Sequence, residues 1–333
     1  MDSHSSGPSI TVLMPVYNAA RFLKEAIESI LNQTWGNFEF LIVDDGSSDD
    51  SVSIIRSYSD PRIRLVLNDT NLGLSPTLNK GLGLAQGAFI ARMDADDVSA
   101  PIRLERQRHA FLKDPELVGV STAVTILNVH GEPLSMLPVL VGDEQIRRAL
   151  SVTNPLAHAS MMFRRDAVLA LGGYNPDTNP VEDFDLWTRL SALGRLANLD
   201  DSLLSYRLNP EGMSIVLQKQ MKEQSDRIME RVWSSFGEDG PAPLRDWNQI
   251  WPEPRTVALA YLHRLFAEGY RKRGRWGLAL RHFFASFGWS ASNRGSVFAA
   301  LMFLMPYRSY SRLEERKTVF LKNARAGVPL FKP

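Results

Sequence analysis

The sequence predicts an α/β fold with a mostly parallel sheet, followed by a helical C-terminal extension. Three observations lead to this prediction. Short β-rich runs alternate with helical patterns in the first part of the chain. Polar residues follow the ends of these runs, which is where parallel sheets bind their ligands. Beyond about residue 215 the pattern becomes helical and rich in Trp, Phe, Arg and Lys.

Four β-rich runs define the first part of the predicted sheet. They lie at residues 10–16, 38–43, 63–67 and 89–93. Helical patterns separate them, at residues 19–32, at 49–58 and from the third run to about residue 86. Strands joined through helices pair in parallel, and the helices then cover both faces of the sheet. The carboxyl ends of these strands therefore share one edge.

The middle of the chain continues the same alternation. A helix is expected at residues 101–113, starting with a proline, which the first turn of a helix tolerates. A strand at 118–127 and a turn-rich connection at 131–142 follow. A short strand at 160–164 then leads into a helix that ends at Gly172-Gly173.

The end of the predicted domain comes shortly before residue 215. A helix at residues 181–193 stops at Gly194. Residues 196–208 are expected to form a closing pair of strands. We therefore divide the chain into a sheet domain, residues 1–215, and a helical, basic region, residues 216–333.

Composition excludes several classes of protein. The chain has no cysteine, which rules out disulfides and thiolate metal sites and fits a reducing compartment. No secretory signal is recognisable at the N-terminus. No run reaches the roughly 18–20 apolar residues that span a bilayer. We therefore expect a cytoplasmic protein.

The C-terminal region has a large excess of positive over negative charge. From Arg255 onward, 15 Lys or Arg residues accompany three acids. Cations mixed with Trp and Phe fit a helix in a membrane interface, so we expect peripheral association with the inner face of the cell membrane. A helical appendage packed on the sheet domain and a dimer interface are the alternatives. Nucleic-acid binding is disfavoured, because no reader motif accompanies the charge.

A cluster of acids follows the fourth predicted strand. Asp94, Asp96 and Asp97 place three carboxylates within four residues. Crowded carboxylates repel one another unless a cation is bound. Their oxygens suit Mg²⁺ or Mn²⁺, which also take phosphate oxygens. Taken alone, the pattern fits a metal site or a solvated acidic turn.

Two further acidic motifs also have two interpretations each. The first, Asp44-Asp45-Gly46-Ser47, forms a strand-end turn, where an Asp can accept an N–H from a nucleotide base. The same turn can simply cap the next helix. The second motif, Glu182-Asp183, begins a helix, where acids complement the helix dipole. Its apolar and aromatic surroundings could instead raise a carboxylate pKa and produce a general base.

Six motifs occur in order between residues 9 and 214. They are Pro15-Val16-Tyr17-Asn18, Asp44-Asp45-Gly46-Ser47, Asn71-Leu72-Gly73, Arg92-Met93-Asp94-Ala95-Asp96-Asp97, Gly172-Gly173-Tyr174 and Glu182-Asp183-Phe184-Asp185-Leu186-Trp187. This ordered set resembles the family 2 glycosyltransferases, which have the GT-A fold with a Rossmann-like sheet. The resemblance implies inverting transfer of a sugar from a nucleotide diphosphate sugar to an acceptor hydroxyl, in the assembly of cell-surface polysaccharide or glycolipid. The acceptor would be a saccharide or a lipid-linked saccharide.

The resemblance also implies roles for individual residues. Those on the nucleotide-sugar side would be Pro15, Tyr17, Asn18, Asp44, Asn71, Asn79, Asp94 and Arg207. Asp96, together with Asp94, would hold Mn²⁺ or Mg²⁺. Asp183 would be the general base, with Glu182 beside it. UDP is the nucleotide that the resemblance implies by default, with dTDP and GDP as alternatives.

The acceptor side has two candidates, His158 and Trp187. A lone His in an apolar context is more often a hydrogen-bonded core residue than part of a binding pocket, and we favour that interpretation for His158. The assignment of both residues to the acceptor side stays open at this point.

The chain departs from the family pattern at two positions. Many relatives have His two residues after the Arg that matches Arg207, and this chain has Asn209. Many also have Arg where this chain has Leu78, which leaves Lys80 or Arg92 to supply that cation.

Two rival functions remain, a non-catalytic nucleotide-sugar-binding module and a nucleotidyltransferase. The first is disfavoured because Asp96 and Asp183 are both present. The second is disfavoured because Tyr17-Asn18-Ala19-Ala20 stands where a Gly-rich triphosphate loop would follow the first strand. A dinucleotide-binding domain lacks support, since no G-x-G-x-x-G follows that strand either.

Overall fold

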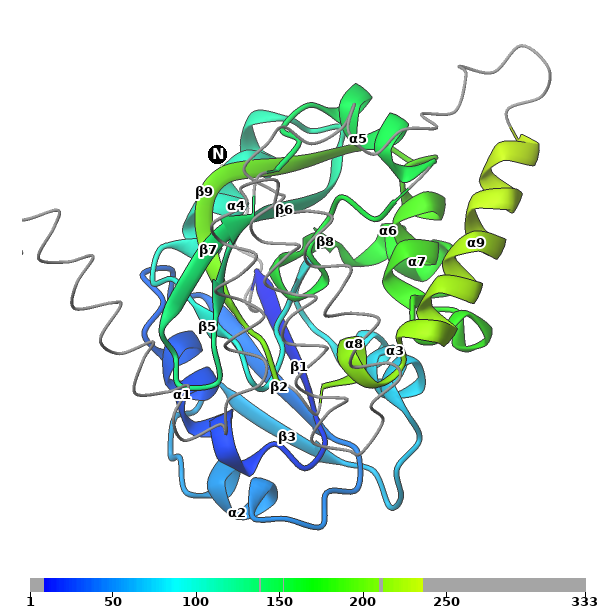
Figure 1. Cartoon of the computed structure of the whole chain (residues 1–333). Coiled ribbons are helices and arrows are strands. Elements are labelled where there is room, and N and C mark those ends of the chain that lie inside the picture. Colours follow the sequence, from blue (N-terminus) through cyan, green and yellow to red (C-terminus); the bar gives the residue numbers. More distant parts are fainter. Residues whose placement is uncertain (1–8, 138, 152, 210–211, 236–333) are drawn as a thin grey trace, which may run out of the picture. The chain divides into compact units, whose positions relative to one another are not determined.

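The β-rich runs of the sequence pair into one mixed sheet in a computed structural model of the chain (Figure 1). The structure describes residues 9–137, 139–151, 153–209 and 212–235. The chain divides into two compact units, Met1–Arg255 and Thr256–Pro333, and every described residue belongs to the first unit. The boundary near residue 215 stays a prediction.

The described residues contribute nine strands to the sheet. They are β1 (Ile10–Val16), β2 (Phe38–Asp44), β3 (Ile63–Leu67), β4 (Phe89–Arg92), β5 (Val98–Ser99), β6 (Leu117–Leu127), β7 (Pro133–Leu137), β8 (Met162–Arg164) and β9 (Arg195–Arg207). Their order across the sheet is β3-β2-β1-β4-β8-β6-β9-β5, with β7 paired to β6. The four predicted strands of the first part pair in parallel, as expected.

Helices connect these strands and cover the sheet. The α-helices are α1 (Ala20–Leu31), α2 (Ser51–Arg56), α3 (Leu74–Leu84), α4 (Arg103–Lys113), α5 (Asp143–Leu150), α6 (Arg165–Ala170), α7 (Glu182–Leu190), α8 (Met213–Val216) and α9 (Gln218–Ser235). Two short 3₁₀ helices, η1 (His158–Ser160) and η2 (Pro176–Thr178), lie between them.

Burial on both faces explains why the central strands read as continuous apolar runs. All seven residues of β2 are buried, as are six of the seven in β1. One core cluster joins Leu13 and Leu41 of the sheet to Leu78 of α3 and Trp187 of α7. The buried side of α1 does not belong to that cluster, and Figure 1 shows α1 and α2 on the other side of the sheet from α3 and α7. The two helical layers are those of a covered parallel sheet.

The predicted closing pair of strands at residues 196–208 is wrong. One continuous strand, β9, pairs in parallel with β6 and antiparallel with β5. The register jumps from Leu199, opposite Thr122, to Ser202, opposite Ala123. Asp200 and Asp201 are therefore extra residues of a bulge rather than a turn, and a bulge bends a strand without ending it.

The sequence prediction also missed elements between the strands. The connection expected at residues 131–142 contains β7, and α5 follows it directly. The two-residue strand β5 was not expected either. None of the described helices has both the length and the apolar character needed to cross a membrane. The basic segment from Arg255 and its predicted membrane contact lie outside the described residues.

Candidate active site

The carboxyl ends of β1 and β2 bring the first polar motifs together. Register places Val16 beside Asp44, so the residues that follow each strand meet at one edge of the sheet. The Asn18 N–H donates to Ser47 Oγ (3.0 Å), and the Ser48 N–H donates to Asn18 Oδ1 (2.8 Å). Asn18 adopts a left-handed backbone (φ 48°), which Asn tolerates better than most residues. The Tyr17 ring is 51% exposed at this edge.

The two aspartates after β2 differ in their environment. Asp45 accepts from the Asn68 side chain (2.7 Å) and from the N–H groups of Leu72 and Gly73 (both 2.9 Å). It therefore shapes the loop that carries Asn71. Asp44 accepts only from the Ser47 N–H through Oδ2 (3.0 Å), and its buried Oδ1 has no hydrogen-bond partner within the described part of the chain. An unsatisfied buried acceptor of this kind is unusual in a folded protein and makes Asp44 a candidate for ligand binding.

Other predicted donor-side residues are placed in different ways. Pro15 lies in β1 opposite Val43. Asn71 is exposed, and its Oδ1 accepts from the Gly73 N–H (3.0 Å). Asn79 forms a reciprocal pair with the backbone N–H and C=O of Tyr174 (both 2.8 Å). Both side-chain polar atoms of Asn79 are thus already used, and its contact with a nucleotide stays a prediction.

The acids after β4 form a crowded cluster in which Asp97 is buried and Asp94 and Asp96 are half-buried. Burial first, and then the charge of Asp94, raise the pKa of Asp96 to about 6. Burial and the charges of Asp94 and Asp96 raise the pKa of Asp97 well above its ordinary value. Asp97 Oδ1 accepts from the Arg207 N–H (2.9 Å), while its buried Oδ2 has no described hydrogen-bond partner. Such a cluster disfavours ionisation and is suited to a cation.

The described residues include no group of three or more His, Cys, Asp or Glu side chains arranged to hold a metal ion. A cation at this edge would therefore take only part of its coordination from Asp94 and Asp96. A hydrogen bond from the Asn209 side chain lowers the pKa of Asp96, against the larger effect of burial. Asn209, one of the two departures from the family pattern, thus lies next to the proposed metal ligand.

Arg207 connects β9 to the acidic loop and to α1. Its Nε donates to the Asp96 carbonyl (2.9 Å), and its Nη2 pairs with Glu25 (2.5 Å). The guanidinium also lies over the Phe22 ring, 4.7 Å from its centroid. In this arrangement the guanidinium of Arg207, which the resemblance assigns to the nucleotide-sugar side, is occupied by protein groups. Arg207 thereby stabilises the loop that contains Asp96 and Asp97.

The helix α7 presents the second acidic pair. Asp183 Oδ2 accepts from Asn154 Nδ2 (2.8 Å), and its Oδ1 accepts from the Phe184 N–H (2.7 Å). Burial raises the pKa of Asp183 to about 6, although these hydrogen bonds oppose the rise. Burial and the neighbouring charge of Asp183 raise the pKa of Glu182 to about 7. A carboxylate with a pKa close to neutrality is suited to general base catalysis.

Three aromatic side chains, those of His158, Tyr174 and Trp187, pack together beside this acidic pair and form an aromatic wall. His158 Nε2 bonds the Tyr174 hydroxyl (3.0 Å), and its Nδ1 lies 3.8 Å from Glu182. Burial, with the charge of Arg92, lowers the pKa of His158 well below its ordinary value, so the ring is neutral. The Trp187 ring meets the His158 ring edge-on, and its buried Nε1 has no partner among the described groups. His158 therefore has the hydrogen bond expected of a core residue.

Arg92 connects the two acidic groups. Its side chain is 2% exposed and pairs with Asp94. Burial has the largest effect on the pKa of Asp96 and of Asp183 and raises both. The charge of Arg92 opposes burial and lowers both pKa values. The charge of Asp94 in turn raises the pKa of Glu182. The charges of Arg92 and Asp94 thus link the acids after β4 and the acids of α7 into one electrostatic cluster.

Sequence reasoning missed Asn154, and it named Arg92 only as an alternative cation. Asn154 is followed by proline, which signals a turn, and nothing in that pattern indicates a bond to a carboxylate 29 residues away. Lys80, the other alternative cation, bonds Asn68 Oδ1 (2.6 Å) and the Leu67 carbonyl. It therefore supports the loop that Asp45 shapes.

Solved structures resemble the chain at the level of the fold. A mannosyltransferase from Pyrobaculum calidifontis, in complex with GDP-Man and Mn²⁺, matches with a TM-score of 0.55 and 21% identity, over 93% of this chain and 85% of that one. TarS 1-349 of S. aureus in complex with UDP-GlcNAc matches with a TM-score of 0.51 and 16% identity, over 81% and 89%. The predicted GT-A fold is confirmed.

Sequence comparisons identify the family. Residues 11–172 match the family described as "Glycosyl transferase family 2". The putative glycosyltransferase EpsE of Bacillus subtilis is 36% identical over 209 residues, which are 61% of this chain and 74% of EpsE. The O-antigen biosynthesis glycosyltransferase WbnJ of Escherichia coli is 33% identical over 205 residues, 60% of this chain and 80% of WbnJ. The chain is therefore a glycosyltransferase and belongs to glycosyl transferase family 2.

Proposed function

We propose that the protein transfers a sugar, with inversion, from a nucleotide diphosphate sugar to an acceptor hydroxyl, with Mn²⁺ or Mg²⁺ as cofactor. The observation that carries the proposal is the single electrostatic cluster formed by the acids after β4 and those of α7. Sugar transfer needs a charge-neutralised leaving group and a base within one site, and this cluster supplies candidates for both.

The donor nucleotide would bind where β1 and β2 end. The unpartnered Oδ1 of Asp44 would accept the ring N–H that uracil, thymine and guanine share. Tyr17 offers an exposed aromatic face beside it. Pro15, Asn18, Asn71 and Asn79 complete the proposed nucleotide side. UDP is our first choice, and GDP and dTDP carry the same hydrogen-bonding group.

Asp96 would be the principal metal ligand, with Asp94 beside it. The donor set fits, since carboxylate oxygens are ligands that Mg²⁺ and Mn²⁺ accept, and since burial without a cation raises the pKa of Asp96. A bound cation would neutralise the charge that develops on the departing diphosphate. Arg207 would assist by holding the loop and, if released from Glu25, by meeting phosphate oxygens.

Asp183 would remove the proton of the acceptor hydroxyl. As that proton moves to the Asp183 carboxylate, the acceptor oxygen forms a bond to the anomeric carbon. The bond from that carbon to the diphosphate oxygen breaks, and its electrons leave with the nucleoside diphosphate. One displacement inverts the anomeric configuration and leaves the proton on Asp183. Glu182, His158 and Trp187 would line the acceptor side of the site.

The names of similar proteins indicate a substrate class. The mannosyltransferase structure contains GDP-Man and Mn²⁺, and the TarS structure contains UDP-GlcNAc. WbnJ is named for O-antigen biosynthesis, and AmsE of Erwinia amylovora for amylovoran biosynthesis. We propose by analogy an acceptor that is a saccharide or lipid-linked saccharide of a cell-surface polysaccharide.

A panel of nucleotide sugars, scored by the rise in unfolding temperature with Mn²⁺, Mg²⁺ or EDTA, tests donor and cofactor together. The preferred donor then enters a transfer and donor-hydrolysis assay. Asp183→Asn should abolish both reactions while the nucleotide still protects against unfolding. Asp166→Asn is the control, because that side chain is 94% exposed.

Two outcomes would favour the rival functions. Donor binding without transfer or hydrolysis by the native enzyme would indicate a non-catalytic binding module. Release of pyrophosphate from a nucleoside triphosphate and a sugar phosphate would indicate a nucleotidyltransferase.

A further inference from the structure

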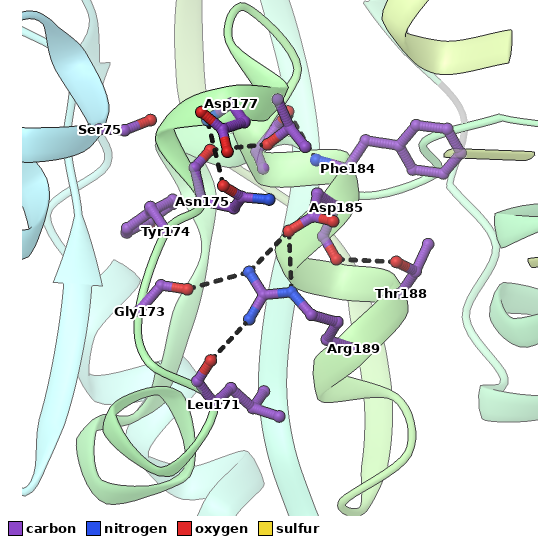
Figure 2. Close-up of polar contacts among 12 residues, drawn as sticks. Ser75, Leu171, Gly173, Tyr174, Asn175, Asp177, Phe184, Asp185, Thr188 and Arg189 are labelled. Atoms are coloured by element: carbon purple, nitrogen blue, oxygen red, sulfur yellow. Dashed lines mark hydrogen bonds and ion pairs between the residues drawn. The ribbon is translucent and has the colours of Figure 1, made fainter. Parts of the chain in front are cut away.

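Asp185, the third acid of the α7 motif, is fully buried, and both of its oxygens are paired. Figure 2 shows its contacts with Arg189. Its Oδ2 accepts from Arg189 Nε (2.8 Å) and pairs with Arg189 Nη2 (2.7 Å). Its Oδ1 accepts from Arg231 Nη2 of α9 (2.6 Å). Two guanidinium groups thus offset the cost of burying one carboxylate. An acid with this surrounding cannot reach a substrate, so its role lies in what its partners hold.

Arg189 uses its remaining donors on a turn that follows α6. Nη1 donates to the Leu171 carbonyl (3.0 Å) and Nη2 to the Gly173 carbonyl (2.9 Å). Figure 2 shows the guanidinium between the Asp185 carboxylate and these two carbonyls. The planar fork of Arg matches this set of acceptors, whereas the single ammonium of Lys does not. Arg189 therefore ties α7 to the Gly172-Gly173 turn.

The turn leads directly into the wall of the active site. Gly172 and Gly173 both have left-handed backbones (φ 79° and 77°). The next residue, Tyr174, is held by Asn79 through its backbone and bonds His158 through its hydroxyl. The place of the Tyr174 hydroxyl is therefore set by how the turn sits on α7.

These contacts form a chain that starts at Asp185 of α7 and returns to the same helix at Glu182. From Asp185 it runs through Arg189 to Gly173, and through Tyr174 to His158. From His158 it returns to Glu182 (3.8 Å), three residues before Asp185 on the same helix. Asp183 stands between Glu182 and Asp185 on α7. A displacement of the turn would move the wall relative to the acidic pair.

We propose that Arg189 is a positioning residue, which joins the Gly172-Gly173 turn to α7 and so fixes the acidic pair against the His158 and Tyr174 wall. The inference rests on the proposed function insofar as Asp183 is the base. Arg189 itself contacts neither donor nor acceptor in this assignment. It acts through Asp185 and the two carbonyls.

Arg147 offers a matched control at the other end of α7. It pairs with Asp143 four residues earlier (2.7 Å), just as Arg189 pairs with Asp185. It also donates to two backbone carbonyls, those of Ser191 and Gly194. The same substitution can therefore be made in two similar networks, of which only one touches the turn that carries Tyr174.

The experiment compares Arg189→Lys with Arg147→Lys in the full-length protein. Arg189→Lys keeps a positive charge beside Asp185, so the protein should fold, but one ammonium cannot reach both carbonyls. We expect kcat to fall about 10- to 100-fold, the range for small misplacements of reacting groups. KM for the donor and protection by UDP should stay within about twofold, as uniform donor binding is untouched. Arg147→Lys should keep kcat within about twofold by the same reasoning.

Amide hydrogen exchange read by mass spectrometry supplies a readout that needs no activity. Residues 171–174 should exchange faster in Arg189→Lys than in the native protein, and should stay unchanged in Arg147→Lys. Unchanged exchange at the turn, equal kcat for the two variants, or a rise in donor KM alone would each overturn the proposal. If the native enzyme transfers and hydrolyses no donor, the proposed function fails, and the exchange result still decides whether Arg189 holds the turn.

Discussion

Asp44 and Asp45 are adjacent in sequence, yet the structure gives them opposite uses. Asp45 satisfies three donors of the protein, and Asp44 keeps one buried oxygen without a described partner. Successive side chains of an extended chain point to opposite faces of the sheet, and Asp44 and Asp45 are successive residues where β2 ends. One carboxylate therefore faces the loop of residues 68–73, and the other is left for a ligand.

We expect Asp44→Asn and Asp45→Asn to have different effects. Asp44→Asn should weaken UDP binding about 10- to 100-fold, as for loss of a hydrogen bond to a charged group, with little change in stability. Asp45→Asn should lower the unfolding temperature, because the loop N–H groups lose their acceptor charge. Isothermal titration calorimetry and thermal unfolding separate the two. Equal loss of UDP affinity without loss of stability in Asp45→Asn would contradict this division.

Asn154 contributes to the ionisation of Asp183. The pKa of Asp183 is raised to about 6 by burial, and the Asn154 hydrogen bond opposes that rise. As the proposed base, Asp183 would work only when ionised, so kcat should increase as the pH rises through this region and level off above it. The charge of Arg92 also lowers the pKa of Asp183. The charge of Asp183 raises the pKa of Glu182, so the two carboxyl groups titrate together.

We expect Asn154→Ala to move the acid limb of the kcat–pH profile upward. Loss of a hydrogen bond worth about 1 kcal/mol should raise its midpoint by about 0.5–1 pH unit. In this variant, kcat on the plateau at high pH should fall by a smaller factor than kcat at pH 6. Steady-state kinetics from pH 5 to 9 with saturating donor measure both quantities. An unshifted midpoint would show that Asn154 does not contact the working base.

At the scale of elements, the turn between α6 and η2 depends on two glycines for different reasons. Both have positive φ, so any side chain strains the backbone there. A Cβ at Gly172 would meet nothing within 4 Å, whereas a Cβ at Gly173 would lie 2.4 Å from Asn79 Oδ1. The close approach at Gly173 lets the Asn79 amide pair with Tyr174.

Gly172→Ala and Gly173→Ala form a matched pair. Both should lose about 1–2 kcal/mol of stability from backbone strain alone. Gly173→Ala should lose more, and it should also reduce kcat because Asn79 must shift and release Tyr174. Urea denaturation and steady-state kinetics test this. Equal losses of stability in the two variants would mean that the Asn79 contact adds nothing.

At the scale of the whole described unit, α9 is attached to the sheet domain through α7. Ile228 of α9 is buried in the core cluster, and Arg231 reaches the buried Asp185. Arg231 is 50% exposed, so solvent screens part of its ion pair. Figure 1 shows α9 lying beside α7. The helix that leads toward the basic C-terminal region thus contacts the helix that carries the proposed base.

We expect Arg231→Met to loosen α9 without unfolding the sheet. Its cost should be about 1 kcal/mol or less, since Asp185 keeps Arg189 as a partner. Lys222→Met is the control, because Lys222 pairs with Asp226 on the exposed surface of α9. Hydrogen exchange of residues 218–235 should accelerate in the first variant and not in the second. Equal exchange in both would show that apolar packing alone holds α9.

The sequence by itself determined the parallel first half of the sheet and the edge at which its polar residues lie. Local patterns sufficed there, because buried parallel strands read as apolar runs and end where polar residues begin. The ordered motifs also indicated the family. The single strand β9 escaped prediction, since Asp200 and Asp201 read as a turn when their pairing partner is unknown.

Only the tertiary structure decided which polar side chains are enclosed by other protein groups and which remain candidates for the site. Asp183 and Asp185 are two positions apart on one helix, and the sequence offers no reason to separate them. Asn154, 29 residues away, bonds the first, and Arg189 and Arg231 enclose the second. Hydrogen bonds of this kind join residues distant in sequence, so their partners are defined only once the chain has packed.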